Sequence, residues 1–426
     1  MKVLLVSANT EQINMPVMPL GMACVKQAVR QAGHLVQALN LMTPEDAETQ
    51  LPTAIFHFKP DVIGISVRNI DDQSMTQPRF LLDAVKPVTT LCRRLSKAPV
   101  VLGGAGFSIF PQSVLDYLGA DFGIQGEGEG VFIDLLSFLE RKEPVPDLPG
   151  LYFPDRRRVG ASISTKTLDD YLLPDPDRTL SSHSSFDSKN IWLPFQSRRG
   201  CPMRCSYCST PVIEGTRLRK RSPENVAAAL RRQVDAGLTQ FFFVDNTFNL
   251  PLSYAKSLCD AIIASGLKIR WQAIIYPNFV DEELVLKMMR AGCVQVSLGF
   301  ESGDEGMLKR MNKHTDPDTI ARISSLFKTH GIRRMGFLLL GGPGETRETV
   351  ERSLSFVRRL DMDIMRITVG IRIYPHTTLA AYARAQGLVS SDDPLLHPRF
   401  FLREKLIPWL PETIHALADE HSNWIL

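Results

Sequence analysis

Three cysteines stand close together in the run CPMRCSYC, at Cys201, Cys205 and Cys208. Thiolates at this spacing can bind three irons of a 4Fe-4S cluster, and no fourth cysteine lies near enough in the sequence to bind the last iron. An iron without a protein ligand can bind another molecule, as the open position of a catalytic zinc site does. Structural zinc is the alternative, but zinc ribbons use paired C-x2-C knuckles and a second knuckle is missing here. The run therefore predicts an iron-sulfur cluster with one free iron.

The cysteine run follows the first of six apolar, strand-like segments in the second half of the chain. These segments alternate with helical stretches, one of which is predicted to begin with Ser222 as its N-cap and Pro223 as its first residue. Six strand-helix units over residues 191–385 predict a partial TIM-type barrel, whose sites lie at the carboxyl ends of the strands. Residues 386–426 are predicted to form a short, mostly helical tail that packs as a cap. The strand candidates are IWLPFQS, TQFFFVD, KIRWQAII, VQVSLGF, RRMGFLLL and MRITVGIRIY.

Residues 1–140 show a similar alternation of apolar strands and helices, which predicts right-handed βαβ units and a doubly wound, Rossmann-like parallel sheet. Ligands bind such sheets outside the carboxyl ends of the strands. A dinucleotide is not expected, because the loop after the first strand reads VSANTEQ and lacks the G-x-G-x-x-G fingerprint. Residues 141–190 are rich in Pro, Asp and Ser and are predicted to be a linker with at most a short hairpin.

The composition is that of an ordinary soluble protein. The chain has 426 residues, 44% of them hydrophobic, and its net charge of +3 gives no reason to expect a nucleic-acid partner. The basic runs at 156–158 and 217–221 are interpreted as solvated surface. Because no run of about eighteen apolar residues is present, no membrane partner is expected. Seven cysteines without a secretion signal predict a reducing compartment and hence a cytoplasmic protein.

The cysteine run resembles the cluster loop of the radical S-adenosylmethionine superfamily, in which an aromatic residue, here Tyr207, precedes the last cysteine. In that family the free iron binds the amino and carboxylate groups of S-adenosylmethionine. An electron from a reducing partner then cleaves the cofactor to a 5′-deoxyadenosyl radical. The motifs FVDNTF, SLGFESG, GFLLLGGPGET and RIYPHTTL resemble the family's further cofactor contacts. The resemblance implies that S-adenosylmethionine is bound by Tyr207, Asp245, Asn246, Glu301, Ser302, Gly341, Gly342 and Tyr374.

The acidic residues of these motifs have a second interpretation. Acidic side chains are common at helix N-caps and in first helical turns. Asp245 and Glu301 could each be an ordinary N-cap, and Glu345 is expected to begin a helix.

The first domain resembles the cobalamin-binding domain that precedes the radical domain in many members of this superfamily. The resemblance rests on MPLGMACVKQAVRQAGH, DVIGIS, VVLGGAGFSIFP and DFGIQGEGE. It implies that glycine loops after strands four and five flank the nucleotide tail and that loops after strands one and three lie under the corrin. The implied cobalamin contacts are Ser66, Arg68, Asn69, Gly103, Gly104, Ser108, Gly126, Glu127 and Gly128.

One departure from other cobalamin proteins concerns the lower face of the cobalt. The Asp-x-His-x-x-Gly motif, which supplies a histidine ligand there, is missing after the first strand. His34 and His57 are the only histidines of residues 1–140, and both are interpreted as surface or partly buried side chains rather than metal ligands. The resemblance therefore implies cobalamin without a protein histidine on cobalt.

The resemblance implies a cobalamin-dependent radical methyltransferase that methylates an unactivated carbon of a small molecule or natural-product intermediate. No catalytic side chain is predicted beyond the cluster and the cofactors. Radical rearrangement or cyclisation without methyl transfer is the main alternative. The chain resembles the tRNA methylthiotransferases less closely. Those enzymes need three further cysteines in the first domain, and residues 1–140 contain only Cys24 and Cys92. A non-catalytic cobalamin sensor is the remaining alternative.

Overall fold

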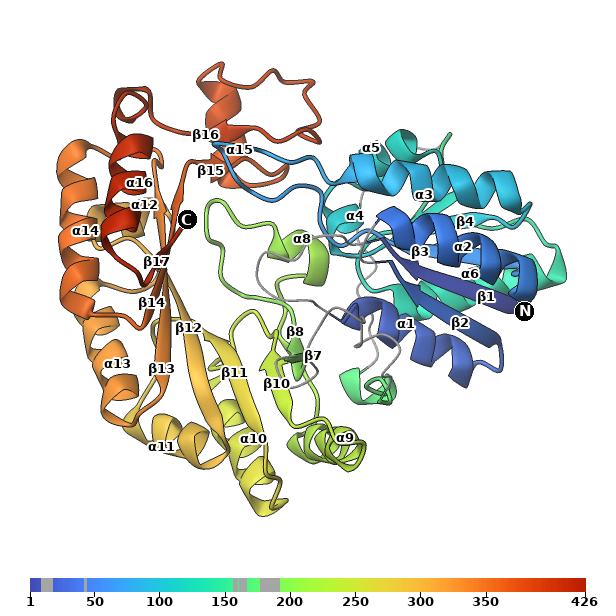
Figure 1. Ribbon diagram of the computed structural model, residues 1–426, viewed down its shortest axis with the longest axis horizontal. Helices are drawn as coiled ribbons and strands as arrows, with labels where there is room; N and C mark the ends of the chain where they lie inside the picture. The colour runs from blue at the N-terminus through green and yellow to red at the C-terminus, as the bar shows by residue number, and fades with distance from the viewer. Residues whose placement is uncertain (9–17, 42–43, 156–159, 161–166, 177–191) are drawn as a thin grey trace.

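The computed structural model describes residues 1–8, 18–41, 44–155, 160, 167–176 and 192–426. The helices and strands form two α/β domains that lie side by side, the first drawn in blue to green and the second in green to red (Figure 1). Each domain is built on one mainly parallel sheet, as the sequence predicts. Among the described residues, no helix is both long enough and apolar enough to cross a membrane.

The first sheet has the strand order β2-β1-β3-β4-β5-β6, in which β1 to β5 are parallel and β6 is antiparallel to β5. Side chains alternate along β1, so that Val3 and Leu5 pack on one face, against α1 and α6. Leu4 and Val6 pack on the other face, against α2, α3 and α5. This confirms the doubly wound sheet. The elements are β1 (Lys2–Ser7), α1 (Leu20–Gln31), β2 (Leu35–Asn40), α2 (Pro44–Phe58), β3 (Val62–Ser66), α3 (Leu82–Leu95), β4 (Val100–Gly103), α4 (Ala105–Ile109), α5 (Pro111–Leu118), β5 (Phe122–Ile124), α6 (Gly128–Arg141) and β6 (Leu151–Tyr152).

The second sheet has the order β17-β14-β13-β12-β11-β10-β7, and all its neighbouring strands are parallel. The six predicted strand segments correspond to β7 and β10 to β14. The sheet ends at β7 and β17 without closing, which agrees with a partial barrel. Its elements are β7 (Leu193–Phe195), β8 (Arg198–Arg199), α8 (Thr210–Glu214), β9 (Arg219–Lys220), α9 (Pro223–Asp235), β10 (Gln240–Phe243), α10 (Leu252–Ala264), β11 (Arg270–Ile275), α11 (Glu282–Arg290), β12 (Cys293–Glu301), α12 (Glu305–Arg310), α13 (Pro317–Thr329), β13 (Arg333–Leu340), α14 (Arg347–Leu360), β14 (Ile364–Val369), β15 (Ile371–Arg372) and α15 (Thr378–Ala385).

Helix α9 begins where the sequence predicts. The Ser222 hydroxyl accepts a hydrogen bond from the Asn225 N–H at 3.4 Å, and Pro223 is the first helical residue. The side chain thus satisfies an amide that has no partner within the helix. The N-cap prediction is confirmed.

The C-terminal segment is less helical than predicted. It contains α16 (Leu410–Glu420), but β16 (Phe400–Phe401) pairs antiparallel with β15, and β17 (Trp424–Ile425) pairs parallel with β14. Trp424 is only 9% exposed and joins the apolar core of the second sheet. Burial of this indole returns the tail to the sheet, which gains one strand beyond the six predicted.

The segment predicted as a linker, residues 141–190, begins inside the first domain. Strand β6 completes the first sheet, and the buried Tyr152 hydroxyl donates a hydrogen bond to Gln125 Oε1 at 2.8 Å. Further along, Leu168 lies in a short 3-10 turn (Leu168–Asp170), and its carbonyl accepts a hydrogen bond from Arg221 at 2.5 Å. The basic run at 156–158 lies outside the described residues.

One apolar cluster continues from the first domain into the second. Leu4, Val6 and Phe110 of the first domain belong to the same buried cluster as Met311 and Ile373 of the second. Separation of the domains would expose this surface to water, so its burial favours the docked arrangement. The first domain therefore packs against the loops that follow the barrel strands.

The glycine-rich loop between β13 and α14 is organised by Glu345. Its carboxylate accepts hydrogen bonds from the amides of Gly341 and of Gly342, the latter at 3.0 Å, while its Oε1 atom is buried without a partner among the described residues. Burial raises the pKa of Glu345 to about 7. Thr346, not Glu345, is the N-cap of α14, because its hydroxyl accepts the N–H of Thr349. The prediction that Glu345 begins the helix is therefore wrong, because the first helical residue is Arg347.

Glu345→Gln keeps an oxygen that can accept both amide hydrogen bonds but removes the charge. Between pH 4.5, the ordinary pKa, and about pH 7, the folded wild type holds a proton that the unfolded chain has released. The free energy of unfolding of the wild type, relative to Glu345→Gln, should therefore fall as the pH rises through this window. We expect a change on the order of 2–3 kcal/mol, measured by urea unfolding of both proteins at several pH values. A difference that does not vary with pH would contradict this assignment.

Candidate cofactor site

The cysteine loop lies between β8 and α8 and is held by backbone hydrogen bonds to three other segments. The Cys201 amide donates to Gly215 O at 3.1 Å, and the Ser206 amide donates to Met311 O at 3.0 Å. The Ser206 carbonyl accepts a hydrogen bond from the Leu379 amide at 2.8 Å. The loop therefore has a defined path between the end of α12 and the start of α15.

The three thiols of the loop are near enough to influence one another. The pKa of Cys201 is raised to about 11, mainly by burial and also by the neighbouring charges of Cys208 and Cys205, while Lys313 acts to lower it. Among the described residues, no three His, Cys, Asp or Glu side chains converge to bind a single metal ion. In a cubane cluster each thiolate binds a different iron, so convergence on one point is not required. The loop is compatible with a 4Fe-4S cluster held by these cysteines.

Lys313 is a residue of this site that the sequence analysis missed. Its ammonium is buried and donates hydrogen bonds to Gly299 O at 2.7 Å and to Glu301 Oε1 at 3.1 Å. Burial opposes this charge, but Glu301 and the Cys205 thiolate outweigh it, and the pKa of Lys313 is raised. Tyr207 shares a hydrogen bond with Glu301, and its ring lies 5.8 Å from the ammonium. Tyr207 and Glu301, which are both predicted S-adenosylmethionine contacts, therefore lie together beside the cluster cysteines. Both lie beside the ammonium of Lys313, which the sequence analysis did not predict.

Asp245 and Asn246 follow β10 but have different surroundings. Asp245 is fully buried, and its oxygens accept hydrogen bonds from the amides of Ser197 and Arg198 and from the Ser197 hydroxyl, at 2.6–3.0 Å. Its role here is to hold the segment before the cysteine loop, and contact with S-adenosylmethionine stays a prediction. Asn246 donates to Glu214 Oε2 at 2.6 Å and lines a pocket between the two domains.

Neither Asp245 nor Glu301 is a helix N-cap, so that alternative is wrong. The N-cap of α12 is Asp304, and that of α10 is Pro251. Glu301 instead ends β12 with a φ of +69°, a conformation that side chains rarely adopt. This strained position directs the end of β12 toward Lys313.

At three other predicted S-adenosylmethionine contacts, the polar groups of the residue already form hydrogen bonds to neighbouring residues of the chain. The Ser302 hydroxyl is buried, lies 3.0 Å from the Ser353 hydroxyl and accepts the Asp304 amide at 3.1 Å. The amides of Gly341 and Gly342 donate to Glu345. A Cβ atom at Gly341 would lie 2.4 Å from the Leu402 side chain, so this glycine admits the tail of the chain. Contacts of Ser302, Gly341 and Gly342 with S-adenosylmethionine stay predictions.

Tyr374 lies where the two domains meet. Its ring centroid is 6.1 Å from that of Phe110 and 5.0 Å from the guanidinium carbon of Arg372. Burial raises the pKa of Tyr374, and the charges of Asp71 in the first domain and Cys208 in the second raise it further. Charged groups of both domains therefore act on the Tyr374 phenol.

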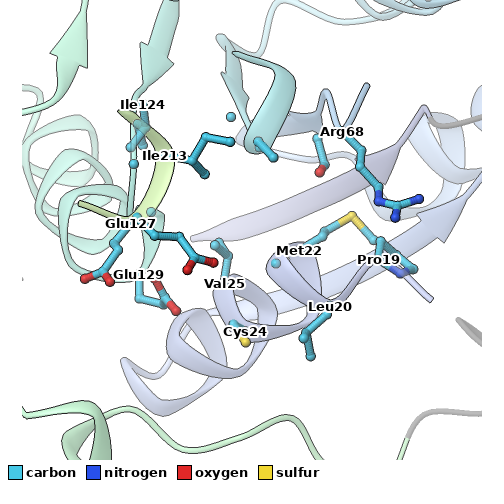
Figure 2. A pocket seen from close by; sticks show the side chains of 18 of the residues that line it. Pro19, Leu20, Met22, Cys24, Val25, Arg68, Ile124, Glu127, Glu129 and Ile213 are labelled. Atoms are coloured by element: carbon cyan, nitrogen blue, oxygen red, sulfur yellow. The ribbon is translucent and has the colours of Figure 1, made fainter. Parts of the chain in front are cut away.

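A pocket of about 480 Å³ opens between the first domain and the start of the barrel. Figure 2 shows residues of α1, of the loops after β3 and β5 and of α8 around it. Most of the predicted cobalamin contacts line it, namely Ser66, Arg68, Gly103, Gly104, Gly126, Glu127 and Gly128. The remaining two predicted contacts, Asn69 and Ser108, are not among the lining residues.

Ser108 shapes the pocket from behind. Its buried hydroxyl donates to Gly104 O at 2.8 Å and accepts the Gly126 amide at 2.9 Å, so it joins the loops after β4 and β5. A Cβ atom at Gly104 would lie 2.5 Å from Val67 O, at a φ of +103°. This glycine therefore lets the loops after β3 and β4 approach each other.

The pocket suits a large ligand with an apolar part. Apolar residues of the sheet and of α6 contribute to its lining, namely Leu5, Val101, Leu102, Ile124 and Phe132. No histidine is among the described lining residues. His34 is half-buried and lies 3.0 Å from the amino terminus, and His57 is exposed on α2, as predicted. The loop after β1, expected under the corrin, continues through residues 9–17, outside the described residues.

The second wall of the pocket comes from the barrel and carries buried charges. Arg199 contacts Glu129 at 2.5 Å and Glu127 at 3.4 Å, and Arg219 donates to Glu127 at 2.8 Å. Glu127 and Glu129 belong to the first domain, so these pairs join the two walls. The run at 217–221 is therefore not solvated surface throughout, because Arg219 and Arg221 are engaged in the interior and only Arg217 and Lys220 are exposed.

Comparisons with known proteins assign both domains. Residues 6–136 match the B12 binding domain, and residues 196–357 match the Radical SAM superfamily. An uncharacterised methyltransferase of Pyrococcus horikoshii is 26% identical, over 95% of this chain and 90% of its own length. A tryptophan 2-C-methyltransferase of Streptomyces laurentii is 25% identical, over 87% and 73%. The radical S-adenosylmethionine methyltransferase TsrM of Kitasatospora setae, solved with cobalamin and a 4Fe-4S cluster, has a TM-score of 0.87 at 22% identity, with 100% of this chain and 92% of TsrM covered.

The matched ranges contain the two parts of the site. The B12 binding range includes the loops after β3, β4 and β5, which line the pocket, and the radical range includes Cys201, Cys205 and Cys208. The chain therefore joins a B12 binding domain to a domain of the radical S-adenosylmethionine superfamily, which is the family that its sequence predicts.

Proposed function

We propose that the chain is a cobalamin-dependent radical S-adenosylmethionine methyltransferase that methylates an unactivated carbon of a small molecule, such as a natural-product intermediate. The observation that carries the proposal is the pocket between the domains. Predicted cobalamin contacts form one wall, and residues beside the cysteine loop form the other. A methyl carrier and a radical source that border one space can act on the same bound carbon.

The residues of the chain bind and orient the cofactors. When bound, the cluster supplies the electron that cleaves S-adenosylmethionine, and cobalamin carries the methyl group. Lys313 balances the negative charges of Glu301 and of the cysteine thiolates in a buried setting. Gly104 and Ser108 fix the loops against which cobalamin is expected to bind. The apolar cluster between the domains keeps water from their interface.

The relatives support transfer to carbon. One is named for C-methylation of tryptophan, and the TsrM structure contains cobalamin and a 4Fe-4S cluster. We extend to this chain a small-molecule substrate and a reducing electron donor, and we propose a cytoplasmic location without a nucleic-acid or membrane partner.

Methylthiolation of tRNA fits this chain poorly. It needs a second cluster in the first domain, but Cys24 and Cys92 lie in α1 and α3 and are both buried. Burial raises the pKa of Cys24 to about 11 and that of Cys92 to about 12, which opposes thiolate formation. Cys92 behaves as a small apolar side chain, and Cys24 lies in the pocket wall beside Arg199.

Both cofactors can be tested without knowledge of the substrate. Protein purified without oxygen and reconstituted with iron, sulfide and cobalamin should hold about four irons and about one cobalt per chain. In the presence of a reductant that forms cob(I)alamin, methyl-deuterated S-adenosylmethionine should pass its labelled methyl group to the bound cobalamin and leave S-adenosylhomocysteine, both detected by mass spectrometry. Cys205→Ala should lose iron and keep cobalt. Iron without cobalt would contradict the proposal, and 5′-deoxyadenosine without transfer of label would favour rearrangement.

Gly104→Ala tests the cobalamin pocket. The added methyl group would press on Val67 O and push apart the loops after β3 and β4. We expect the dissociation constant for hydroxocobalamin, measured by fluorescence quenching, to rise about tenfold or more. Gly119→Ala is the matched control, because Gly119 also has a positive φ, of +65°, but no atom within 4 Å of the added carbon. Equal affinities of the two variants would argue against a site at this loop.

Lys313→Met tests the charge beside the cysteine loop. The change leaves the Glu301 carboxylate buried without its cation, which is strongly unfavourable. We expect the rate of 5′-deoxyadenosine formation to fall about tenfold or more, an effect of about 1.4 kcal/mol on the barrier. Lys309→Met removes a similar pair, with Glu305, but that pair is exposed and its loss should change the rate little. Similar rates for both variants would assign Lys313 no part in the site.

A further inference from the structure

Asp71 and Arg372 form a buried ion pair between the two domains. Asp71 Oδ2 accepts a hydrogen bond from Arg372 Nε at 2.8 Å, and the two side chains are 1% and 3% exposed. Asp71 lies in the loop after β3, and Arg372 lies in β15 of the barrel. A buried charge is unfavourable without a partner, so each residue holds the other domain in place.

Arg372 is also fixed by its own domain. One terminal nitrogen donates to Ile373 O at 2.6 Å, and the other donates to Leu395 O at 2.9 Å and Leu396 O at 3.2 Å. Across the domain boundary, its guanidinium carbon lies 5.6 Å from the ring of Phe110 in the first domain. A guanidinium with this many partners has one preferred orientation, which Asp71 must match.

The loop that bears Asp71 also contributes to the cobalamin pocket. It leaves β3 at Val67, and its next residue, Arg68, lines the pocket. Asp71 and Phe80 form a bridge across the base of the loop, and the Phe80 ring lies 4.4 Å from that of His397. The ion pair therefore fixes a loop whose residue Arg68 borders the pocket (Figure 2).

Arg372 also lies beside the predicted S-adenosylmethionine site. The Tyr374 ring lies 5.0 Å from the Arg372 guanidinium carbon, and the Tyr374 phenol is within reach of the charges of Asp71 and Cys208. Neither Asp71 nor Arg372 is among the residues that line the pocket. The pair thus lies between the two sites, beside residues of each.

We propose that Asp71 and Arg372 are a positioning pair that fixes the loop of Arg68 relative to Tyr374, and with it the separation of the cobalamin and S-adenosylmethionine sites. The inference rests on the proposed function and adds the residues that set its geometry. Contact between this loop and the barrel then includes this charge-assisted hydrogen bond as well as apolar packing.

Hydrogen exchange of the purified protein tests the pair without any cofactor. In Asp71→Asn, amides of residues 67–81 should exchange about tenfold faster or more, and Arg372→Lys, which keeps the charge but not the planar fork, should have a smaller effect. The control is Asp363→Asn. Asp363 pairs with Arg334 Nε at 3.1 Å, and Arg334 also donates to backbone carbonyls, but this pair lies at the amino end of β13.

The spectrum of bound cobalamin gives a second readout. The electron paramagnetic resonance spectrum of bound cob(II)alamin depends on the groups around the cobalt, and it is compared only between proteins that retain the cofactor. We expect an altered spectrum in Asp71→Asn and the wild-type spectrum in Asp363→Asn. A wild-type spectrum in Asp71→Asn would overturn the link between the pair and the cobalamin site.

The outcomes separate this inference from the proposed function. Exchange of residues 67–81 that is unchanged in both Asp71→Asn and Arg372→Lys overturns the positioning role, whether or not cobalamin binds. Faster exchange in Asp363→Asn as well would show general loosening and would also overturn it. If the wild type binds no cobalamin but Asp71→Asn exchanges faster, the proposed function fails and the pair still positions the loop.

Discussion

Docking of the first domain against the carboxyl ends of the barrel strands is the constraint on which the site depends. Buried charges hold this arrangement at two places. Arg199, just after β7, meets Glu129, and Arg372, just after β14, meets Asp71. Because β7 and β14 lie near opposite edges of the open sheet, the first domain is fixed on both sides of the barrel mouth. Separation would expose unpaired charges and an apolar cluster together.

Docking supplies the second wall of the pocket. Its glycine loops belong to the first domain, whereas Gln196, Glu214 and Asn246 belong to the barrel. Glu214 accepts hydrogen bonds from Gln196 at 2.9 Å, from the Gly200 amide at 3.1 Å and from Asn246 at 2.6 Å. One carboxylate thus joins the pocket wall to the residue before the first cysteine. A ligand in the pocket would therefore contact residues that are linked by hydrogen bonds to the start of the cysteine loop.

The parts of the site that follow local rules could be predicted from the sequence. Ser222 with Pro223 marks a helix start, and the cysteine spacing lies on one loop, so neither needs knowledge of distant residues. Gly103 and Gly104 follow a short apolar strand, and parallel strands gather their carboxyl ends at one edge of a sheet. That geometry is why glycines assigned from a linear pattern line the pocket. Asp245 shows the limit of prediction from local patterns. Its oxygens accept hydrogen bonds from Ser197, whose position relative to Asp245 no local sequence pattern fixes.

Buried charges were the features that the sequence could not reveal, because a charged residue has the same local pattern whether it meets water or a distant partner. Arg219 and Glu127 are 92 residues apart, and Arg372 and Asp71 are 301 apart. The run at 217–221 nevertheless contains a signal. Arg219 and Arg221 lie inside while Lys220 is exposed, which is the two-residue alternation of a strand. Basic residues spaced by two in a short strand can thus mark an inward face, and burial then requires acidic or carbonyl partners from elsewhere in the chain.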